Sequence, residues 1–383
     1  MTDTYCQFPY RQVRISPIGE YSPCCQFNSM ENDHNAITSI QQYLASDELQ
    51  SIKDRLGKGE RIPECKFCWN QEDQGMVSLR QSQTAKPVTA IKEFFIEFGN
   101  TCNAACRMCH SGRSSLIGQY ERKFLKSEPD SDLAVLFSDP DFFITEKFWY
   151  KNIGESLVEY VEDLDYIQVS GGEPFINVYF DRFLDTLINS GKRLPKICIT
   201  TNGSFTAEQF AKLDAFESIE IYLSGDSLTK DYYEYLRWPL KYDDLLQSIE
   251  IMENYKSDIK PRYEFQAVLQ NLNLLDVKET IRFFNERFAD DDRFNLSYTT
   301  LNTSEWYHPH NSPKWVREKV VERLEWVEFH PRIKPDKKNL VNLLNSDHPK
   351  VDLQILEKHV KYTDSYRGIN TWEFLGWKPE DIS

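Results

Sequence analysis

The sequence predicts an α/β fold with parallel strands, and three observations favour it. The 383-residue chain is 40% hydrophobic and 14% aromatic, which is enough for a large core and excludes wholesale disorder. From Ile91 onward, short apolar strands alternate with amphipathic helices, as in successive βαβ units. No internal repeat or low-complexity tract is visible, so a solenoid is excluded. The length suits one large α/β domain with a smaller unit beside it.

The alternating region gives the expected strands and helices in order. The strands are expected at Glu93–Phe98, Tyr166–Ser170, Lys196–Thr201, Ser218–Leu223, Arg262–Leu269 and Phe294–Thr299. The helices between them are expected at Tyr179–Ser190, Ala207–Phe216, Asp243–Tyr255 and Val277–Phe288. Six strands in this span are fewer than an eight-stranded barrel needs, since that fold typically takes ~250 residues. A doubly wound sheet and an incomplete barrel both fit the pattern.

The segments that flank this region differ from it. In front, apolar side chains at helical spacing predict one helix at Thr38–Leu56, and the polar stretch Gln81–Thr89 predicts a domain boundary. Behind it, Ser312 and Pro313 predict the cap and first turn of a helix that buries Val316, Val320, Leu324 and Val327. The C-terminal tryptophans are expected in the core. The predicted domains are therefore residues 1–85, 90–302 and 303–383.

Charge and hydropathy restrict the partners and the compartment. The chain has 45 Lys and Arg against 60 Asp and Glu, which gives a net charge of −15. This charge disfavours a protein that binds nucleic acid by neutralising its phosphates. No apolar run approaches the roughly 18 residues of a membrane helix, so no membrane contact is expected. The start, MTDTYCQFPYRQ, does not resemble a secretory signal, so a cytoplasmic location is expected. In that compartment the nine cysteines are expected to be metal ligands or catalytic thiols instead of disulfides.

Three cysteines lie close together directly after the first expected strand. Cys102, Cys106 and Cys109 have the spacing C-x3-C-x2-C. Three thiolates on one loop can bind three irons of a [4Fe-4S] cluster and leave the fourth iron without a protein ligand. An open metal position can bind a small chelating molecule. The alternative is a structural zinc loop.

Polar and glycine-rich turns follow the next three strands. Gly171, Gly172, Glu173 and Pro174 end the second strand, where the glycines allow close approach of a ligand and Glu173 offers a carboxylate to an ammonium group. The ends of the third and fourth strands carry further candidates, Thr201, Asn202, Gly203, Ser224 and Asp226. Each turn alone is ordinary strand-to-helix chemistry. Together they lie at the strand ends where barrels of this kind keep their active sites.

These motifs in combination resemble the radical S-adenosylmethionine (SAM) superfamily over residues 91–300. The resemblance implies a partial (β/α)6 TIM-like barrel with a small N-terminal cysteine-rich module and a helical C-terminal extension. It implies that the open iron of a [4Fe-4S] cluster binds the amino and carboxylate groups of SAM. The residues implied in the site are Cys102, Cys106 and Cys109 for the cluster, Gly171, Gly172, Glu173 and Pro174 for the methionyl amine, Thr201 and Asn202 beside them, and Ser224 and Asp226 for the ribose.

The same resemblance implies the chemistry. The reduced cluster passes one electron to the sulfonium of SAM, which yields methionine and a 5′-deoxyadenosyl radical that abstracts hydrogen from a substrate. An external electron donor of the flavodoxin or ferredoxin type is implied as a partner. Gly225 stands where many members have a hydrophobic residue, and the family's G-x-I-x-G-x-x-E pattern is absent from YEFQAVLQN, so adenine contacts stay unassigned.

The front of the chain carries a second set of cysteines, Cys6, Cys24, Cys65 and Cys68. The runs G-x4-C at Cys24 and C-x2-C at Cys65 and Cys68 resemble the twitch, or reduced SPASM, module of peptide-modifying radical SAM enzymes. Here the module precedes the barrel, and its C-x5-C-x3-C tail is absent. The resemblance implies an auxiliary [4Fe-4S] cluster, with Cys25 as an alternative to Cys24. A zinc site with four cysteine ligands is the alternative, and Cys198 is expected to be a buried apolar residue.

The expected function is that of a radical SAM enzyme acting on a peptide or protein side chain, because the auxiliary module accompanies such reactions in similar proteins. The alternative within the superfamily is a small-molecule substrate such as a sugar or nucleotide. A different class, a metal-stabilised scaffold without catalysis, is disfavoured because a scaffold does not need Glu173 beside a cluster loop.

Overall fold

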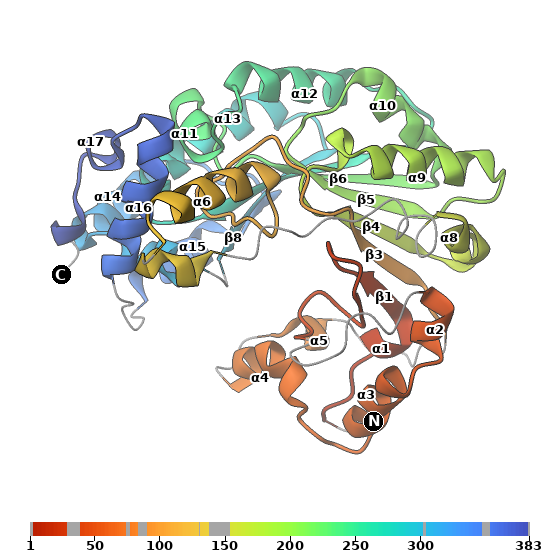
Figure 1. The fold of residues 1–383 in the computed structure, drawn as a ribbon. Coiled ribbons are helices and arrows are strands. Elements are labelled where there is room, and N and C mark those ends of the chain that lie inside the picture. Colours follow the sequence, from red (N-terminus) through yellow and green to blue (C-terminus); the bar gives the residue numbers. More distant parts are fainter. Residues whose placement is uncertain are drawn as a thin grey trace. The chain divides into compact units, whose positions relative to one another are not determined.

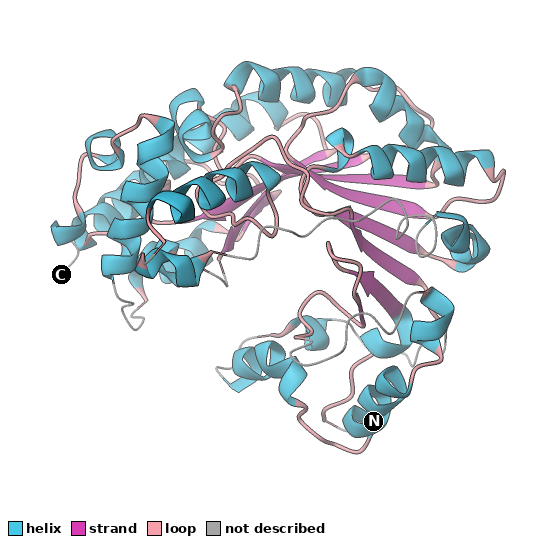
Figure 2. Ribbon diagram, viewed as in Figure 1, coloured by secondary structure: helices cyan, strands magenta, loops and turns pink. Residues whose placement is uncertain are grey.

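The computed structural model describes residues 3–28, 39–73, 77–82, 90–129, 131–137, 154–301, 304–346 and 353–381. Nine strands and the helices that accompany them lie in these residues (Figures 1 and 2). The chain divides into two compact units, each assembled from separate segments. The first comprises Met1–Thr101, Asp141–Ile199 and Glu208–Ile219, and the second comprises Cys102–Pro140, Thr200–Ala207 and Glu220–Ser383.

The first unit contains a mostly parallel set of strands. They are β1 (Gln12–Ile15), β2 (Tyr21–Ser22), β3 (Glu93–Glu97), β4 (Tyr166–Ser170) and β5 (Lys196–Thr201). β1 pairs antiparallel with β2 and parallel with β3, and β3, β4 and β5 continue in parallel register. β1 therefore extends this sheet with residues that the sequence assigned to the front module.

The helices of the first unit are short in the front segment and longer beside β4 and β5. They are α1 (Phe8–Arg11), α2 (Ile40–Leu44), α3 (Asp47–Gly57), α4 (Lys66–Asp73), α5 (Leu79–Ser82), α8 (Gly154–Tyr160), α9 (Val178–Asn189) and α10 (Ala207–Ala211), with 3-10 turns η1 (Pro63–Cys65), η4 (Val161–Asp163), η5 (Pro174–Ile176) and η6 (Lys212–Ala215). α8 and α9 lie next to each other beside the strands (Figure 1).

Alternation along the strands separates a core face from a polar face. In β4 the side chains of Ile167 and Val169 are fully buried, whereas Tyr166, Gln168 and Ser170 are half-buried. The core face is filled by aromatic rings, since Phe98 packs edge-on against Phe180 and Phe175 packs on the same ring. The opposite face of the first unit is therefore left for polar groups.

The second unit contains the remaining strands, β6 (Ser218–Ser224), β7 (Arg262–Leu269), β8 (Phe294–Thr300) and β9 (Ile333–Lys334). β6, β7, β8 and β9 pair in parallel in that order. Its helices are α6 (Ser115–Ser127), α11 (Lys230–Leu236), α12 (Tyr242–Asn254), α13 (Val277–Phe288), α14 (Lys314–Glu325), α15 (Lys337–Asn345), α16 (Leu353–Arg367) and α17 (Thr371–Leu375), with 3-10 turns η2 (Asp132–Leu136), η7 (Leu274–Asp276), η8 (Glu305–Tyr307), η9 (Pro309–Asn311) and η10 (Pro379–Asp381). Phe265, Phe288 and Phe294 stack between β7, β8 and α13 and form part of its core.

The strand predictions agree closely with the structure, whereas the prediction of one helix in the front segment does not. All six expected strands are present, and β4, β5 and β7 have the predicted bounds. Where one helix was expected at Thr38–Leu56, the structure has two, α2 and α3. The residues that the structure describes in this stretch begin at Ser39. α2 ends at Leu44 with Ala45 as its C-cap. Ser46 then caps α3, because its hydroxyl accepts a hydrogen bond from the backbone N–H of Leu49 at 3.2 Å. Most of the expected boundary, residues 83–89, lies outside the described residues.

The C-terminal helix prediction was right in its buried face and wrong in its cap. α14 buries Val316, Val320 and Leu324, but Pro313 occupies the cap position. The Ser312 hydroxyl instead donates to the carbonyl oxygen of Pro309 at 2.6 Å, which takes it away from the helix start. Among the tryptophans expected in the core, Trp377 is 3% exposed, whereas Trp326 is 81% exposed.

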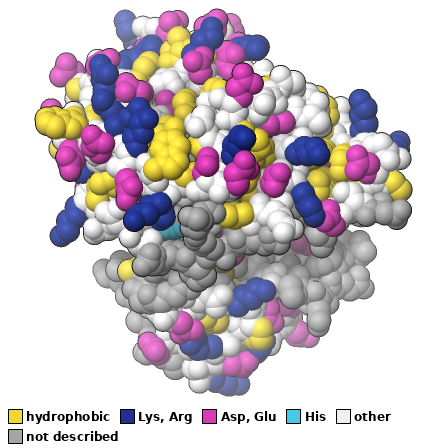
Figure 3. All heavy atoms as spheres, turned by 90° about the vertical axis from the view of Figure 1, so that its left-hand side faces the viewer, with side chains coloured by type: hydrophobic (Ala, Val, Ile, Leu, Met, Phe, Trp, Pro, Cys, Tyr) yellow, Lys and Arg dark blue, Asp and Glu magenta, His cyan; other side chains and the backbone are white. Residues whose placement is uncertain are grey.

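The α/β class with mostly parallel strands is thus confirmed. The three expected domains stay a prediction, because the compact units of the structure are both discontinuous in sequence. On the face seen in Figure 3, basic and acidic side chains are interspersed. Among the helices that the structure describes, none is long and apolar enough to cross a membrane.

Candidate active site

The loop that carries Cys102, Cys106 and Cys109 follows β3 and precedes α6, and we call residues 102–109 the cysteine loop. All three thiols are half-buried, and none forms a disulfide. The backbone N–H of Cys102 donates to the hydroxyl of Ser115 at 3.2 Å, which fastens the loop to the first turn of α6. The hydroxyl of Ser114 accepts from the N–H of Ile117 and thereby caps α6. The same hydroxyl donates to the carbonyl oxygen of Ala104 at 2.6 Å, which holds the cysteine loop against the start of this helix.

Two further elements of the second unit hold the cysteine loop. The N–H groups of Ala105 and Arg107 donate to the carbonyl oxygens of Trp238 and Leu236, at 2.7 and 3.0 Å, at the end of α11. The side chain of Arg107 is fully buried and reaches α16, where it donates to the Asp364 carboxylate at 2.6 Å. The loop is therefore fixed on both sides by partners distant in the sequence.

Burial governs the protonation of two thiols in this loop, those of Cys106 and Cys109. It raises the pKa of Cys109 to about 12 and also raises the pKa of Cys106, while the positive charge of Arg237 acts in the opposite direction on both. Thiols are therefore the favoured form without a metal, and a metal ion would release their protons on binding. Three thiols on a fixed, half-buried loop with a cation nearby fit the donor set of a [4Fe-4S] cluster with one open iron.

The predicted GGEP turn depends on both of its glycines. Gly171 and Gly172 have positive φ angles of 89° and 56°. A Cβ atom on Gly172 would lie 2.2 Å from the carbonyl oxygen of Thr101, so no larger residue fits without a shift. The N–H of Glu173 donates to the same carbonyl at 2.8 Å. The turn thus packs on Thr101, the residue before Cys102 in the chain.

Glu173 and Pro174 are buried at the start of η5. Glu173 is 0% exposed, and one carboxylate oxygen accepts a hydrogen bond from the N–H of Phe175 at 3.1 Å. Pro174 occupies the first turn of η5, which suits its missing N–H. The carboxylate of Glu173 therefore caps this turn, and its role toward an ammonium group stays a prediction.

The turn after β5 is tied to the cysteine loop within the second unit. The amide of Asn202 donates to the side-chain oxygen of Asn103 at 2.9 Å, and the amide of Asn103 donates to the hydroxyl of Ser204 at 2.9 Å. Thr201 is buried and accepts from the N–H of Gly203 at 3.0 Å. Two of the predicted site elements, the loop and the Thr201–Asn202 turn, thus meet in the structure.

Two predicted site residues lie at the end of β6, and they differ in burial. Ser224 is half-buried at the last position of the strand. Asp226 is 2% exposed with a positive φ of 55°. Its carboxylate accepts from the N–H of Val268 at 2.9 Å and pairs with Arg237 at 2.8 Å. Protein groups therefore occupy the Asp226 carboxylate, and the ribose contact of both residues stays a prediction.

The four front cysteines converge in the first unit, and we call them the front cysteine site. They come from the chain before α1, the turn after β2, η1 and α4, namely Cys6, Cys24, Cys65 and Cys68. Cys6 and Cys24 belong to one buried cluster with Trp69, and Cys65 packs against it. Burial raises the pKa of Cys6 to about 11 and of Cys65 to about 12, with smaller contributions from neighbouring cysteines. Cys68 acts on Cys6 and Cys65, and Cys6 and Cys65 act on Cys24, so the four groups lie near one another.

An arginine lies beside the front cysteine site. The Arg80 guanidinium lowers the pKa of Cys6 and of Cys65 against the stronger effect of burial. It is held in place by the Glu72 carboxylate at 2.6 Å and by the carbonyl oxygen of Tyr5 at 2.9 Å. Cys25, the alternative to Cys24, is exposed, whereas Cys24 is buried. Cys198 is 0% exposed in β5, as predicted.

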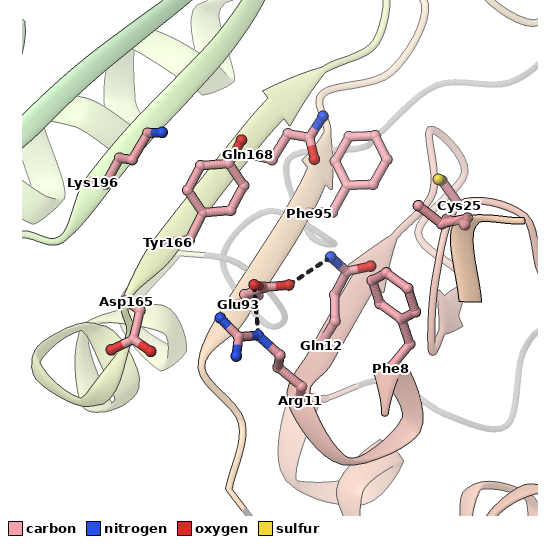
Figure 4. Close-up of a pocket in the computed structure, with 11 residues that line it drawn as sticks. Phe8, Arg11, Gln12, Cys25, Glu93, Phe95, Asp165, Tyr166, Gln168 and Lys196 are labelled. Atoms are coloured by element: carbon pink, nitrogen blue, oxygen red, sulfur yellow. Dashed lines mark hydrogen bonds and ion pairs between the residues drawn. The ribbon is translucent and has the colours of Figure 1, made fainter. Parts of the chain in front are cut away.

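A cavity of about 420 Å³ opens on the polar face of the first unit (Figure 4). It lies over β1, β3, β4 and β5, and its lining includes Gln12, Tyr166, Gln168, Lys196 and Cys25. The Glu93 carboxylate in its floor accepts from Arg11 at 2.6 Å and from Gln12 at 3.3 Å. Sequence analysis did not predict this cavity, because alternation in the strands indicates a polar face but not a hollow in it.

The described residues contain no group of three or more His, Cys, Asp or Glu side chains arranged around a single metal ion.

Sequence analysis did not predict the arginines and Asp364 around the cysteine loop. One signal for Arg107 was present in the sequence, its position between Cys106 and Cys109 in the C-x2-C spacing. Nothing in the sequence indicates that its partner lies in α16.

The comparison with protein families identifies the class. The model of the radical SAM superfamily matches residues 96–284, which include the cysteine loop, the GGEP turn and the ends of β5 and β6. Residues 96–284 are thus identified as a radical SAM domain. In this superfamily the cofactors are SAM and a [4Fe-4S] cluster, and the chemistry is reductive cleavage of SAM.

Several solved structures are distantly similar. The structure of anSMEcpe with bound AdoMet is 17% identical with a TM-score of 0.42, over 61% of this chain and 59% of that chain. SuiB of Streptococcus suis bound to precursor peptide SuiA is 14% identical with a TM-score of 0.36, over 80% and 56%. The methyltransferase TsrM of Kitasatospora setae with cobalamin and a [4Fe-4S] cluster is 12% identical with a TM-score of 0.36, over 66% and 42%. The chain thus spans less than two thirds of the length of each. The comparison with curated proteins finds no match.

Proposed function

We propose that this protein is a radical SAM enzyme that modifies a side chain of a peptide or protein and uses two iron–sulfur clusters to do so. The observation that carries the proposal is the convergence of the four front cysteines from separate parts of the chain in one buried site. A site of this kind is expected of the twitch module, which accompanies peptide modification in similar enzymes. The fold proposed for this enzyme is the partial (β/α)6 barrel of the superfamily.

The proposed first cluster is held by Cys102, Cys106 and Cys109. A [4Fe-4S] cluster with an open iron supplies one-electron cleavage of SAM when both are bound. The chain's own contribution is to fix the loop through the contacts of Ala105 and Arg107 with the end of α11. The residues proposed to hold SAM are Gly171, Gly172, Glu173, Pro174, Thr201, Asn202, Ser224 and Asp226.

The proposed second cluster is held by the front cysteine site. Three buried thiols and the half-buried thiol of Cys65 provide a complete set of ligands, and the guanidinium of Arg80 favours the thiolate forms of Cys6 and Cys65. Burial among Phe8, Phe27 and Trp69 would exclude water from the cluster. Cys24 is proposed as the ligand in preference to Cys25 because its side chain lies in this cluster of buried residues.

The cavity on the polar face of the first unit suits part of a peptide substrate. Its amide groups, Gln12 and Gln168, can both donate to and accept from a peptide backbone, and Lys196 supplies a positive charge. Its volume lies within the range of ligand-binding pockets. Reduction of the first cluster would require an external donor of the flavodoxin or ferredoxin type.

The test is anaerobic turnover of candidate substrates by reconstituted enzyme with SAM and dithionite, followed by mass spectrometry. The proposal predicts a peptide product lighter than its substrate by the mass of two hydrogen atoms. The variant Cys65→Ala/Cys68→Ala is expected to abolish that product. Turnover of sugars or nucleotides, with no peptide or protein modified, would overturn the peptide assignment.

A further inference from the structure

Three buried arginines lie in or beside the cysteine loop in the second unit, and two of them have a carboxylate partner. Arg107 pairs with Asp364 at 2.6 Å, and Arg237 pairs with Asp226 at 2.8 Å. Arg107 also lies over the ring of Tyr235, with 4.3 Å between the guanidinium carbon and the ring centroid. These two arginines are therefore compensated by protein groups.

The third arginine, Arg367, is the last residue of α16 and is 8% exposed. It donates to the carbonyl oxygen of Ala105 in the cysteine loop and to the carbonyl oxygen of Tyr235 at 3.3 Å. Among the described residues no carboxylate pairs with it, and its Nε atom is buried without a hydrogen bond. Carbonyl oxygens satisfy N–H groups, but they do not neutralise a charge.

The charges around the loop therefore do not balance within the described residues. Three positive guanidiniums are matched by two negative carboxylates, so one positive charge has no carboxylate partner there. The remaining acid nearby, Glu121, hydrogen-bonds with Ser111, and burial raises its pKa to about 7. A buried charge without a partner is strongly unfavourable. The end of the α16 helix dipole compensates it only in part.

An oxidised [4Fe-4S] core bound by three thiolates has a net negative charge, because the thiolate charges outweigh the positive charge of the core. We propose that Arg367 is the buried counter-cation of the cluster on the cysteine loop and positions that loop through Ala105. The inference rests on the proposed ligation by Cys102, Cys106 and Cys109. It makes the C-terminal helix α16 a part of the cluster site, although its sequence lies outside the matched family region.

The test measures the unfolding midpoint and the cluster reduction potential in Arg367→Gln and Arg367→Lys. A counter-cation stabilises the cluster-loaded protein and adds an unpaired charge to the apo protein. Arg367→Gln is therefore expected to lower the unfolding midpoint of the loaded protein more than that of the apo protein. It is also expected to shift the potential of this cluster downward, because removal of a nearby positive charge disfavours reduction. Arg367→Lys is expected to restore the potential, because it restores the charge.

Arg107→Gln is the matched control, since it leaves Asp364 unpaired whether or not a cluster is bound, and it is expected to destabilise both forms. Equal destabilisation of apo and loaded Arg367→Gln, with an unchanged potential, would overturn the inference and leave a merely structural hydrogen bond. If Arg367→Gln does not fold, an unchanged potential in Arg367→Met expressed with the cluster would overturn it equally. Failure of wild-type protein to bind iron at the cysteine loop would instead refute the proposed ligation itself.

Discussion

The guanidinium of Arg107 lies 2.6 Å from the carboxylate of Asp364, 257 residues further along the chain. Asp364 also accepts hydrogen bonds from the N–H and the hydroxyl of Thr371, both at 2.8 Å, so it joins α16 to α17 as well. The loop that carries the three family cysteines is thus held by the C-terminal helices of the same unit. The C-terminal segment is consequently more than an appended helical extension.

Gly172→Ala is expected to destabilise the protein and to weaken SAM binding. The new methyl group would lie 2.2 Å from the carbonyl oxygen of Thr101, and the φ of 56° is itself unfavourable for alanine. Overpacking of this kind costs about 1–3 kcal/mol. Gly191→Ala is the matched control, because Gly191 has a φ of 65° but, among the described residues, no atom beyond its chain neighbours would lie within 4 Å of the added methyl group. Equal shifts of the two variants in chemical denaturation would contradict the packing argument.

Asp226→Asn is expected to reduce stability more than it alters SAM binding. The change leaves the buried Arg237 without its carboxylate partner, and the loss of one member of a buried pair costs about 3–5 kcal/mol. Asp292→Asn serves as the comparison, since the Asp292–Lys260 pair is exposed and contributes little. Urea unfolding measures the first effect, and calorimetric titration with SAM measures the second. A stable Asp226→Asn protein with strongly weakened SAM binding would instead support direct contact with the cofactor.

His359 is expected to make stability fall in mild acid. Burial, with smaller effects from Arg367 and Arg107, lowers the pKa of this histidine to about 3, and its Nδ1 atom is hydrogen-bonded with the Tyr307 hydroxyl at 2.7 Å. Below its unfolded pKa of about 6.5, the unfolded chain takes up a proton that the folded chain does not, so stability present above that pH is lost toward pH 3.

The expected loss from this group is roughly 1–2 kcal/mol between pH 7 and pH 5. Glu121 acts in the opposite direction, because burial raises its pKa to about 7. The comparison of wild type with His359→Gln in urea unfolding at both pH values isolates the histidine. A pH dependence that is the same in both proteins would show that His359 does not titrate in this way.

The front cysteine site is expected to be separable from SAM cleavage. Cys65→Ala/Cys68→Ala should lose about four irons per chain yet retain uncoupled cleavage of SAM. Cys24→Ala should lose the same iron, whereas Cys25→Ala should keep it, because the first thiol is buried in the site and the second is exposed. Iron and zinc analysis of anaerobic protein provides the measurement. About one zinc and only about four irons in the wild-type protein would contradict a second cluster.

Local patterns in the sequence predicted what depends on local physics. Strand β4 was predicted to the residue, because Tyr166–Ser170 alternates between a buried and a half-buried face. Ser46 broke an expected helix because a hydroxyl that caps the next segment competes with continuation of the first. Partners brought together by the fold were not predictable in this way. The Arg107–Asp364 pair and the contact of Arg367 with Ala105 join positions more than 250 residues apart, and no local pattern encodes them.

The most direct test of the central claim is formation of 5′-deoxyadenosine by anaerobic, iron-loaded protein supplied with SAM and dithionite. We predict about eight irons per chain and measurable 5′-deoxyadenosine in the wild type. The variant Cys102→Ala/Cys106→Ala/Cys109→Ala is predicted to lose about four irons and all of the 5′-deoxyadenosine, because no open iron remains to bind SAM. Undiminished 5′-deoxyadenosine in that variant, or none from fully loaded wild-type protein, would contradict the assignment of the cysteine loop as the site of radical formation.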